Sequence, residues 1–194
     1  MRGAGLNLVA ACGVLLAAAC GRAEERPGAG LSPFAASEEQ PVQTELIAEH
    51  ASIRPGGATR IGVHFELEEG WHIYAQEPGD AGLPTTISWS VPEPLARFVS
   101  FGALQWPAPQ EFFDPGDIRT FGYSGAVVLS TTLRFTMPGL AGQPVTELPL
   151  HAKVQWLACK EICIPGSAAL ELTLPVSSNT PVFSAHAELF DHTP

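Results

Sequence analysis

The stretch TRIGVHFEL, residues 59–67, shows the pattern that decides the fold of this chain. Its apolar residues Ile61, Val63, Phe65 and Leu67 alternate with small or polar residues, so an extended backbone would place all four on one side. This period of two predicts a strand with one buried and one solvent-facing side. The same alternation recurs in four later stretches, at residues 87–91, 127–135, 148–156 and 170–174.

Proline and glycine punctuate the chain between these stretches and predict turns there. The breaks are Pro55-Gly56-Gly57, Glu69-Gly70, Pro78-Gly79, Pro107 to Pro109, Pro115-Gly116, Pro138-Gly139 and Pro165-Gly166. No amphipathic helix is evident before residue 182, and a single helical turn is expected near residues 183–190. Seven or eight short strands with frequent turns predict an all-β fold, an antiparallel immunoglobulin-like β-sandwich, with a small barrel as the alternative.

The N-terminal residues are typical of an export signal. Arg2 precedes an apolar stretch at residues 6–16 and three alanines at 17–19, which together predict a signal peptide over residues 1–20. Cys20 follows directly, as in a lipobox whose cysteine is lipidated. Ordinary cleavage near Ala19 or Ala23, or an uncleaved anchor, remain alternatives. Either cleavage places the folded part outside the cytoplasm, in the periplasm, where disulfides persist.

Composition and charge divide the remaining 174 residues into three parts. Residues 21–41 are rich in Pro, Gly, Ala and Glu without apolar periodicity, which predicts a flexible linker. Residues 42–176 form the expected sandwich domain, and residues 177–194 a polar tail. The net charge of −10, with only ten Lys and Arg among all 194 residues, argues against nucleic acid or an anionic lipid surface as a partner.

The cysteine pair Cys159 and Cys163 lies in the run QWLACKEICIPG. On an extended strand the two would be about 13 Å apart, at about 3.3 Å per residue. A disulfide needs α-carbons within about 7 Å, so the chain must bend between them if they are joined. We expect that bend between a strand ending near Trp156 and the strand at 168–174, at one rim of the sandwich. Because Pro165-Gly166 follows at once, no helix can begin there to activate a thiol.

Three roles for this pair are open from the residues alone: a redox-active dithiol, an inert disulfide and a metal site. A disulfide that closes so short a loop restrains the unfolded chain little. Two thiolates could hold a cuprous ion, with Met137 or His151 as further ligands. The histidines show no metal-ligand spacing, and no Ser, His and Asp set is recognisable; the histidines are His50, His64, His72, His151, His186 and His192.

Three segments carry a family resemblance: GWHIYAQEPGDAGLPTTISWSVPE at 70–93, QWPAPQEFFDPGDIRTFGYSG at 105–125, and KVQWLACKEICIPG at 153–166. Together, in this order, they resemble the N-terminal periplasmic domain of the thiol:disulfide interchange protein DsbD and its ScsB-type relatives. The resemblance implies an immunoglobulin-like fold and a redox-active disulfide that needs no other cofactor. The spacing Cys-Lys-Glu-Ile-Cys is closer to the ScsB-type branch.

The resemblance also implies roles for individual residues. Cys159 and Cys163 match the redox pair, and Cys163 matches the cysteine that forms the mixed disulfide with a partner. Phe121 and Tyr123 resemble the cap loop that shields the pair, with Tyr74 packed nearby. From the residues alone, all three are also typical of core or turn positions.

Expected partners are periplasmic thioredoxin-like oxidoreductases, including factors for cytochrome c maturation or copper tolerance. No membrane electron conduit lies before Pro194, so a separate membrane protein is the expected electron donor.

Overall fold

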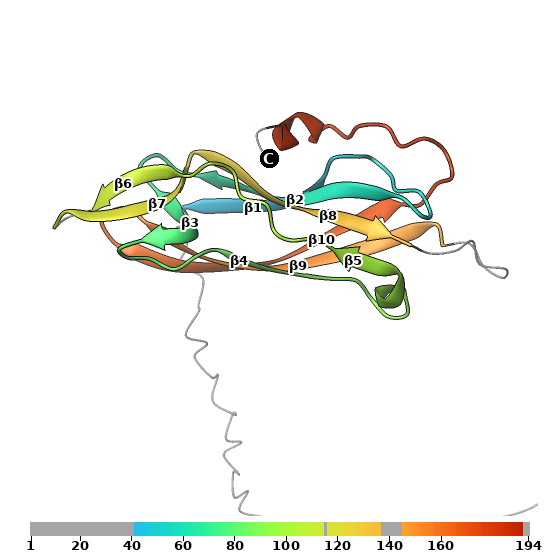
Figure 1. Cartoon of the computed structure of the whole chain (residues 1–194), viewed down its shortest axis with the longest axis horizontal. Coiled ribbons are helices and arrows are strands. Elements are labelled where there is room, and N and C mark those ends of the chain that lie inside the picture. Colours follow the sequence, from blue (N-terminus) through green and yellow to red (C-terminus); the bar gives the residue numbers. More distant parts are fainter. Residues whose placement is uncertain (1–40, 115, 137–144, 192–194) are drawn as a thin grey trace, which may run out of the picture. The chain divides into compact units, whose positions relative to one another are not determined.

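The computed structural model describes residues 41–114, 116–136 and 145–191, which form an antiparallel two-sheet β-sandwich (Figure 1). The described residues contain ten strands, more than the seven or eight predicted, because short strands also form at 99–101 and 110–114. The strands are β1 (Val42–Ala48), β2 (Ala58–Leu67), β3 (His72–Gly79), β4 (Thr86–Ser90), β5 (Val99–Phe101), β6 (Gln110–Asp114), β7 (Ile118–Ser124), β8 (Ala126–Phe135), β9 (Glu147–Cys159) and β10 (Cys163–Pro175). Two 3-10 helices, η1 (Leu95–Phe98) and η2 (Ala187–Phe190), complete the elements.

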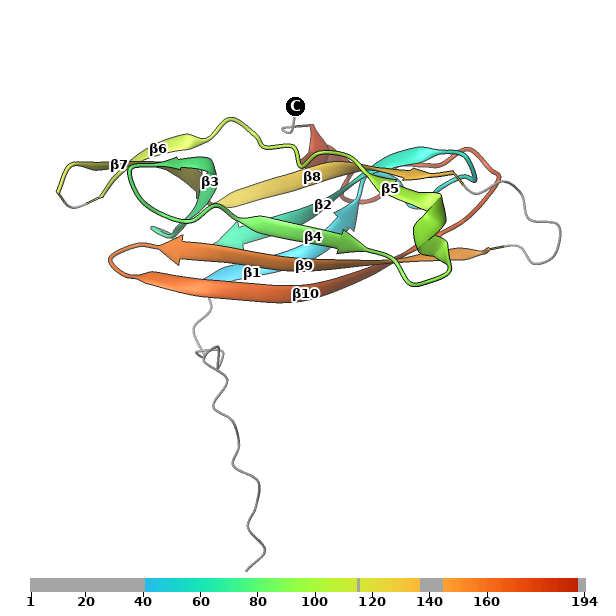
Figure 2. The ribbon, with the colours of Figure 1, turned by 60° about the horizontal axis from the view of Figure 1, so that its bottom comes forward.

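One sheet has the strand order β1-β2-β8-β5 and the other the order β10-β9-β3-β7-β6, with β4 also paired to β9. All the pairings between named strands are antiparallel. Figure 2 shows β4, β9 and β10 running side by side in the second sheet. The predicted immunoglobulin-like sandwich is therefore confirmed.

The core lies between the sheets and is built from the alternating residues that the sequence singled out. Ile61, Val63 and Phe65 are fully buried in β2. Phe65 meets Trp156 of the opposite sheet edge to face, with ring centroids 5.9 Å apart. The same alternation is buried along β8 and β9, at Val127, Leu129, Leu133, Phe135, Leu148, Leu150, Ala152 and Val154.

The predicted break at Pro165-Gly166 is wrong, because both residues lie inside β10. Proline is tolerated there since β10 is the last strand of its sheet and needs donors on one side only. A side chain on Gly166 would collide with the Trp156 indole, so glycine lets that ring lie across β10. The bend therefore falls on residues 160–162, closer to the cysteines than predicted.

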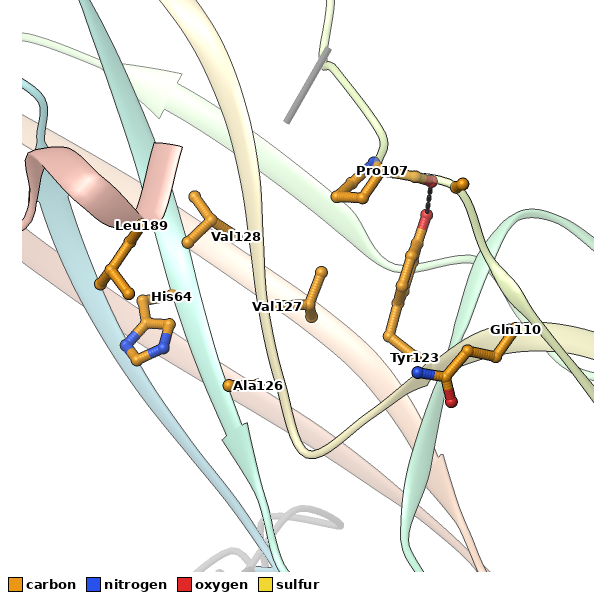
Figure 3. A pocket seen from close by; sticks show the side chains of 9 residues that line it. His64, Pro107, Gln110, Tyr123, Ala126, Val127, Val128 and Leu189 are labelled. Atoms are coloured by element: carbon orange, nitrogen blue, oxygen red, sulfur yellow. Dashed lines mark hydrogen bonds between the residues drawn. The ribbon is translucent and has the colours of Figure 1, made fainter. Parts of the chain in front are cut away.

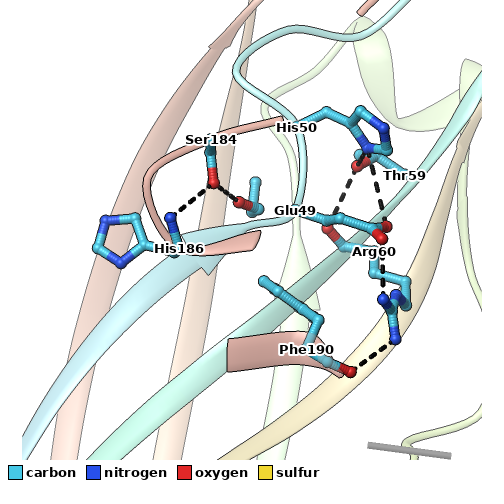
Figure 4. Close-up of polar contacts among 8 residues, drawn as sticks. Glu49, His50, Thr59, Arg60, Ser184, His186 and Phe190 are labelled. Atoms are coloured by element: carbon cyan, nitrogen blue, oxygen red, sulfur yellow. Dashed lines mark hydrogen bonds and ion pairs between the residues drawn. The ribbon is translucent and has the colours of Figure 1, made fainter. Parts of the chain in front are cut away.

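The segment after Val176, predicted to be a polar tail, packs across the outer side of β1, β2 and β8. Phe190 of η2 is fully buried in a small cluster with Ile47 and Val128. Arg60 donates one hydrogen bond to the Phe190 carbonyl and another to the Glu49 carboxylate, both 2.8 Å long (Figure 4). Phe190, the most deeply buried residue of this cluster, thus lies beyond residue 176, the predicted end of the domain.

Several predictions fall outside the described residues. These are the signal peptide 1–20, the lipidation site Cys20, the linker up to residue 40, Met137 and the break at Pro138-Gly139. In the described part of the chain, no helix has the length and apolar character needed to cross a membrane.

Candidate functional site

Cys159 and Cys163 form a disulfide at the hairpin that joins β9 to β10. Cys159 is the last residue of β9 and Cys163 the first of β10, and the two are directly paired across the ladder. Their α-carbons are 4.1 Å apart. The three-residue loop between them is closed by a hydrogen bond of 3.1 Å from the Lys160 amide to the Ile162 carbonyl. The hairpin itself therefore supplies the bend that the spacing demanded.

The two cysteines of this disulfide differ in their exposure to solvent. Cys159 is only 2 % exposed, whereas Cys163 is exposed at the start of the edge strand β10. An attacking thiolate must approach one of the two sulfurs, and access is one of the factors that select it. The geometry thus favours attack at Cys163.

Tyr74 supplies a hydrogen-bond donor to the buried sulfur. Its hydroxyl donates to Cys159 Sγ over 3.1 Å, and the whole residue is 3 % exposed. The ring is held from the other side by Gly82, which has a φ of +99° and where a side chain would collide with the Tyr74 ring. The prediction placed Tyr74 near the pair, and the structure brings the two together.

His72 and Phe112 form an aromatic wall beside Tyr74. His72 is the register partner of Cys159. Its ring stacks on Phe112 with centroids 4.4 Å apart and meets Tyr74 edge to face at 5.2 Å. Neither residue was predicted to belong to the site. The signal that could have found them is strand alternation, because His72 and Tyr74 are two residues apart and must share a face of β3.

The structure does not bring Phe121 and Tyr123 to the disulfide. In β7, Gly122 pairs with Tyr74, so Gly122 shares the face of the disulfide while its two neighbours point the other way. Tyr123 is buried in the core and donates a hydrogen bond of 2.8 Å to the Pro107 carbonyl (Figure 3). This burial raises the pKa of Tyr123 to about 12. The Phe121 ring packs under Arg119, whose guanidinium carbon is 5.0 Å from the ring centroid.

A cavity of about 340 Å³ is lined in part by Tyr123 and does not include either cysteine in its lining. Val127, Val128 and Leu189 provide its apolar lining, and His64 and Gln110 its polar side chains (Figure 3). No charged side chain of the lining points to a particular ligand.

Within the described residues, no group of three or more His, Cys, Asp or Glu side chains could hold a metal ion. His151, considered above as a copper ligand, lies eight positions before Cys159 in β9 and pairs with Glu171 at 3.4 Å. Eight residues of strand span about 26 Å, so His151 cannot join the two sulfurs in one coordination sphere.

Comparison with known proteins agrees with this site. Residues 38–175 match the family described as thiol:disulfide interchange protein DsbD, N-terminal. The chain belongs to this family. As a DsbD N-terminal domain it carries a disulfide-bonded cysteine pair, Cys159 and Cys163. No curated protein sequence matches the chain.

Two solved structures are similar to this DsbD N-terminal domain. The N-terminal periplasmic domain of ScsB from Proteus mirabilis has 23 % sequence identity and a TM-score of 0.53, over 80 % of this chain and 56 % of that one. The chain therefore spans little more than half the length of that relative. The reduced DsbD N-terminal domain of Neisseria meningitidis has 16 % identity and a TM-score of 0.32, over 71 % of this chain and 89 % of that one.

Proposed function

We propose that this domain is a periplasmic thiol:disulfide relay that passes electrons between thioredoxin-like proteins through Cys159 and Cys163. The observation that carries this proposal is the asymmetry of the disulfide. One cysteine is exposed, and the sulfur of the other is buried under a tyrosine hydroxyl. An inert disulfide has no need of a donor aimed at one sulfur, whereas an exchanging disulfide must stabilise a leaving thiolate.

The reductive half-reaction begins when a thiolate of the partner attacks Cys163 Sγ. The bond between the two sulfurs breaks, and its electron pair leaves on Cys159 Sγ, where the Tyr74 hydroxyl can donate to the new thiolate. The second thiol of the partner then attacks the mixed disulfide and releases Cys163. The partner loses two electrons and becomes a disulfide, while this domain gains two electrons and takes up two protons as a dithiol.

The oxidative half-reaction is the reverse sequence with a different partner. The Cys163 thiolate attacks the disulfide of an oxidised acceptor and forms a mixed disulfide. Cys159 resolves it, so the acceptor leaves as a dithiol. The same exposed cysteine meets both partners, which suits a relay that is itself unchanged after each cycle.

Exposed apolar side chains near the site support docking of another protein. Ile162 lies between the two cysteines and is 65 % exposed. Leu83, also exposed, follows Gly82 at the Tyr74 ring. Groups of apolar side chains that are exposed to solvent in the free protein are typical of protein interaction sites.

The cap role predicted for Phe121 and Tyr123 is better filled by Phe112, because Phe112 shares the face of the disulfide. We further infer export through the signal at residues 1–20, with lipidation at Cys20 and a separate membrane protein as electron donor. Cytochrome c maturation or copper tolerance would be the processes served. Growth with labelled fatty acid tests the lipidation, since Cys20→Ala should abolish incorporation.

The relay itself is tested by trapping its mixed disulfide. In Cys159→Ser the resolving thiol is gone, so oxidised thioredoxin-like proteins should form a covalent complex with Cys163 that survives on a non-reducing gel. Cys163→Ser is the matched control, because its remaining thiol at Cys159 is buried and should trap little. The relay proposal fails if Cys159→Ser traps no periplasmic thioredoxin-like protein, or if both variants trap equally.

A further inference from the structure

The loop between the two cysteines is fastened to a neighbouring turn by Lys160. Its ammonium donates a hydrogen bond of 3.0 Å to the Glu69 carbonyl, in the turn that joins β2 to β3. Gly70 in that turn has a φ of +84°, and a β-carbon there would be 2.8 Å from Lys160 Cε. Glycine at this position therefore gives the lysine chain a path across the turn.

This contact lies at the open end of a very short ladder. β3 and β9 share only two residue pairs, His72 with Cys159 and Ile73 with Ala158. These pairs hold Cys159 beside Tyr74. The bond from Lys160 to Glu69 adds a crosslink directly beyond them, where a ladder would otherwise open first.

We propose that Lys160 is a positioning residue that keeps the Cys159 sulfur buried under Tyr74, and so determines that partners attack Cys163. The inference rests on the proposed relay, because it concerns which sulfur of the same disulfide reacts. When the crosslink opens, the end of β9 can separate from β3. Cys159 then loses its cover, and the two sulfurs become more alike in access.

A purely electrostatic role for Lys160 has the opposite signature. A nearby cation favours the thiolate and therefore speeds the reaction of a thiol with a disulfide reagent. Removing that cation would slow Cys159, whereas removing the crosslink exposes Cys159 and makes it react faster. The direction of the rate change separates the two roles.

The test uses the full chain with Cys12→Ser, Cys20→Ser and Cys163→Ser, so that Cys159 is the lone thiol, and measures its reaction with Ellman's reagent. Adding Lys160→Met, which keeps the approximate length of the side chain but removes the donor, should raise the rate about 3- to 10-fold, the modest effect of losing one exposed hydrogen bond from an ammonium to a carbonyl. Lys160→Arg can still donate to the Glu69 carbonyl and should stay within about twofold of the parent. Lys153→Met is the matched control, because Lys153 lies exposed on the same strand away from the disulfide.

Cys163 serves as the internal reference for folding and access. In chains carrying Cys12→Ser, Cys20→Ser and Cys159→Ser, Lys160→Met should leave the Cys163 rate unchanged, because Cys163 is exposed already. An unchanged or slower Cys159 rate in Lys160→Met overturns the positioning role, and so does an equal increase in Lys153→Met or Lys160→Arg. The rate measurements need no partner protein. They can therefore refute the positioning role of Lys160 while mixed-disulfide trapping succeeds, or support that role while trapping fails.

Discussion

Replacing Tyr74 with phenylalanine should slow the reduction of the disulfide while leaving the fold in place. The substitution removes one hydroxyl group, the donor that lies 3.1 Å from Cys159 Sγ. The ring stays, and with it the contacts to His72 and to the backbone at Gly82. The change therefore isolates the hydrogen bond to the leaving sulfur.

The size of the effect follows from the charge that develops on Cys159. A hydrogen bond to a charged group contributes about 1.5–3 kcal/mol. Only part of the negative charge has reached the leaving sulfur in the transition state, so roughly half of that energy, about 0.8–1.5 kcal/mol, is lost from the barrier. At about 1.4 kcal/mol per factor of ten, the rate constant should fall roughly 4- to 12-fold.

The assay is reduction of the oxidised domain by excess dithiothreitol, quenched with acid at intervals and followed by alkylation and mass measurement. Tyr123→Phe is the matched control, since these are the chain's two tyrosines and the Tyr123 hydroxyl bonds to the Pro107 carbonyl on the opposite face. Tyr123→Phe should cost some stability without changing the rate. The reasoning is refuted if Tyr74→Phe reacts at the parent rate, or if both variants slow equally.

Three further expectations concern the scaffold. Phe190→Ala should lower the free energy of unfolding in urea by about 3–5 kcal/mol, because it empties a fully buried site, and Val182→Ala, at an exposed position, should change it little. The hydrogen bond from Arg60 holds the pKa of Glu49 below its ordinary value of 4.5, so the stability from this pair is present above pH 4.5 and is lost as the pH falls through the lowered value. Urea midpoints at pH 7 and pH 3 should therefore differ more for the parent than for Glu49→Gln, and equal differences would contradict the assignment. Gly122→Ala should destabilise by about 1–3 kcal/mol, because a β-carbon there collides with the Ile73 carbonyl, while Gly102→Ala, with no atom closer than 3.6 Å, should melt near the parent temperature.

Strand alternation carried most of the fold prediction. Ile61, Val63 and Phe65 are buried as their period of two indicated, because one side of each such strand must face the core. The prediction failed at Pro165-Gly166, where the same turn-forming residues lie within a strand. Only the topology shows that β10 is at the edge of its sheet, where a missing backbone donor costs nothing.

The site was predictable in part. The spacing of Cys159 and Cys163 required a bend, and the family resemblance pointed to the pair and to Tyr74. The choice between Phe121 and Phe112 as a neighbour of the disulfide depends on the register of β6, β7 and β3. A shift by one residue exchanges the two faces of a strand, and no local sequence pattern determines that shift when both faces are partly covered.

The amino-acid order alone determined that this chain forms half-buried strands, and that its two late cysteines need a tight bend between them if they are joined, because both properties depend on spacing along the backbone. Tertiary structure decided which sulfur is buried, which aromatic rings stand beside it, and that Phe190 completes the outer side of a sheet. Those properties depend on contacts between residues far apart in the chain, and the packing of two sheets and a returning C-terminal segment is what brings them together.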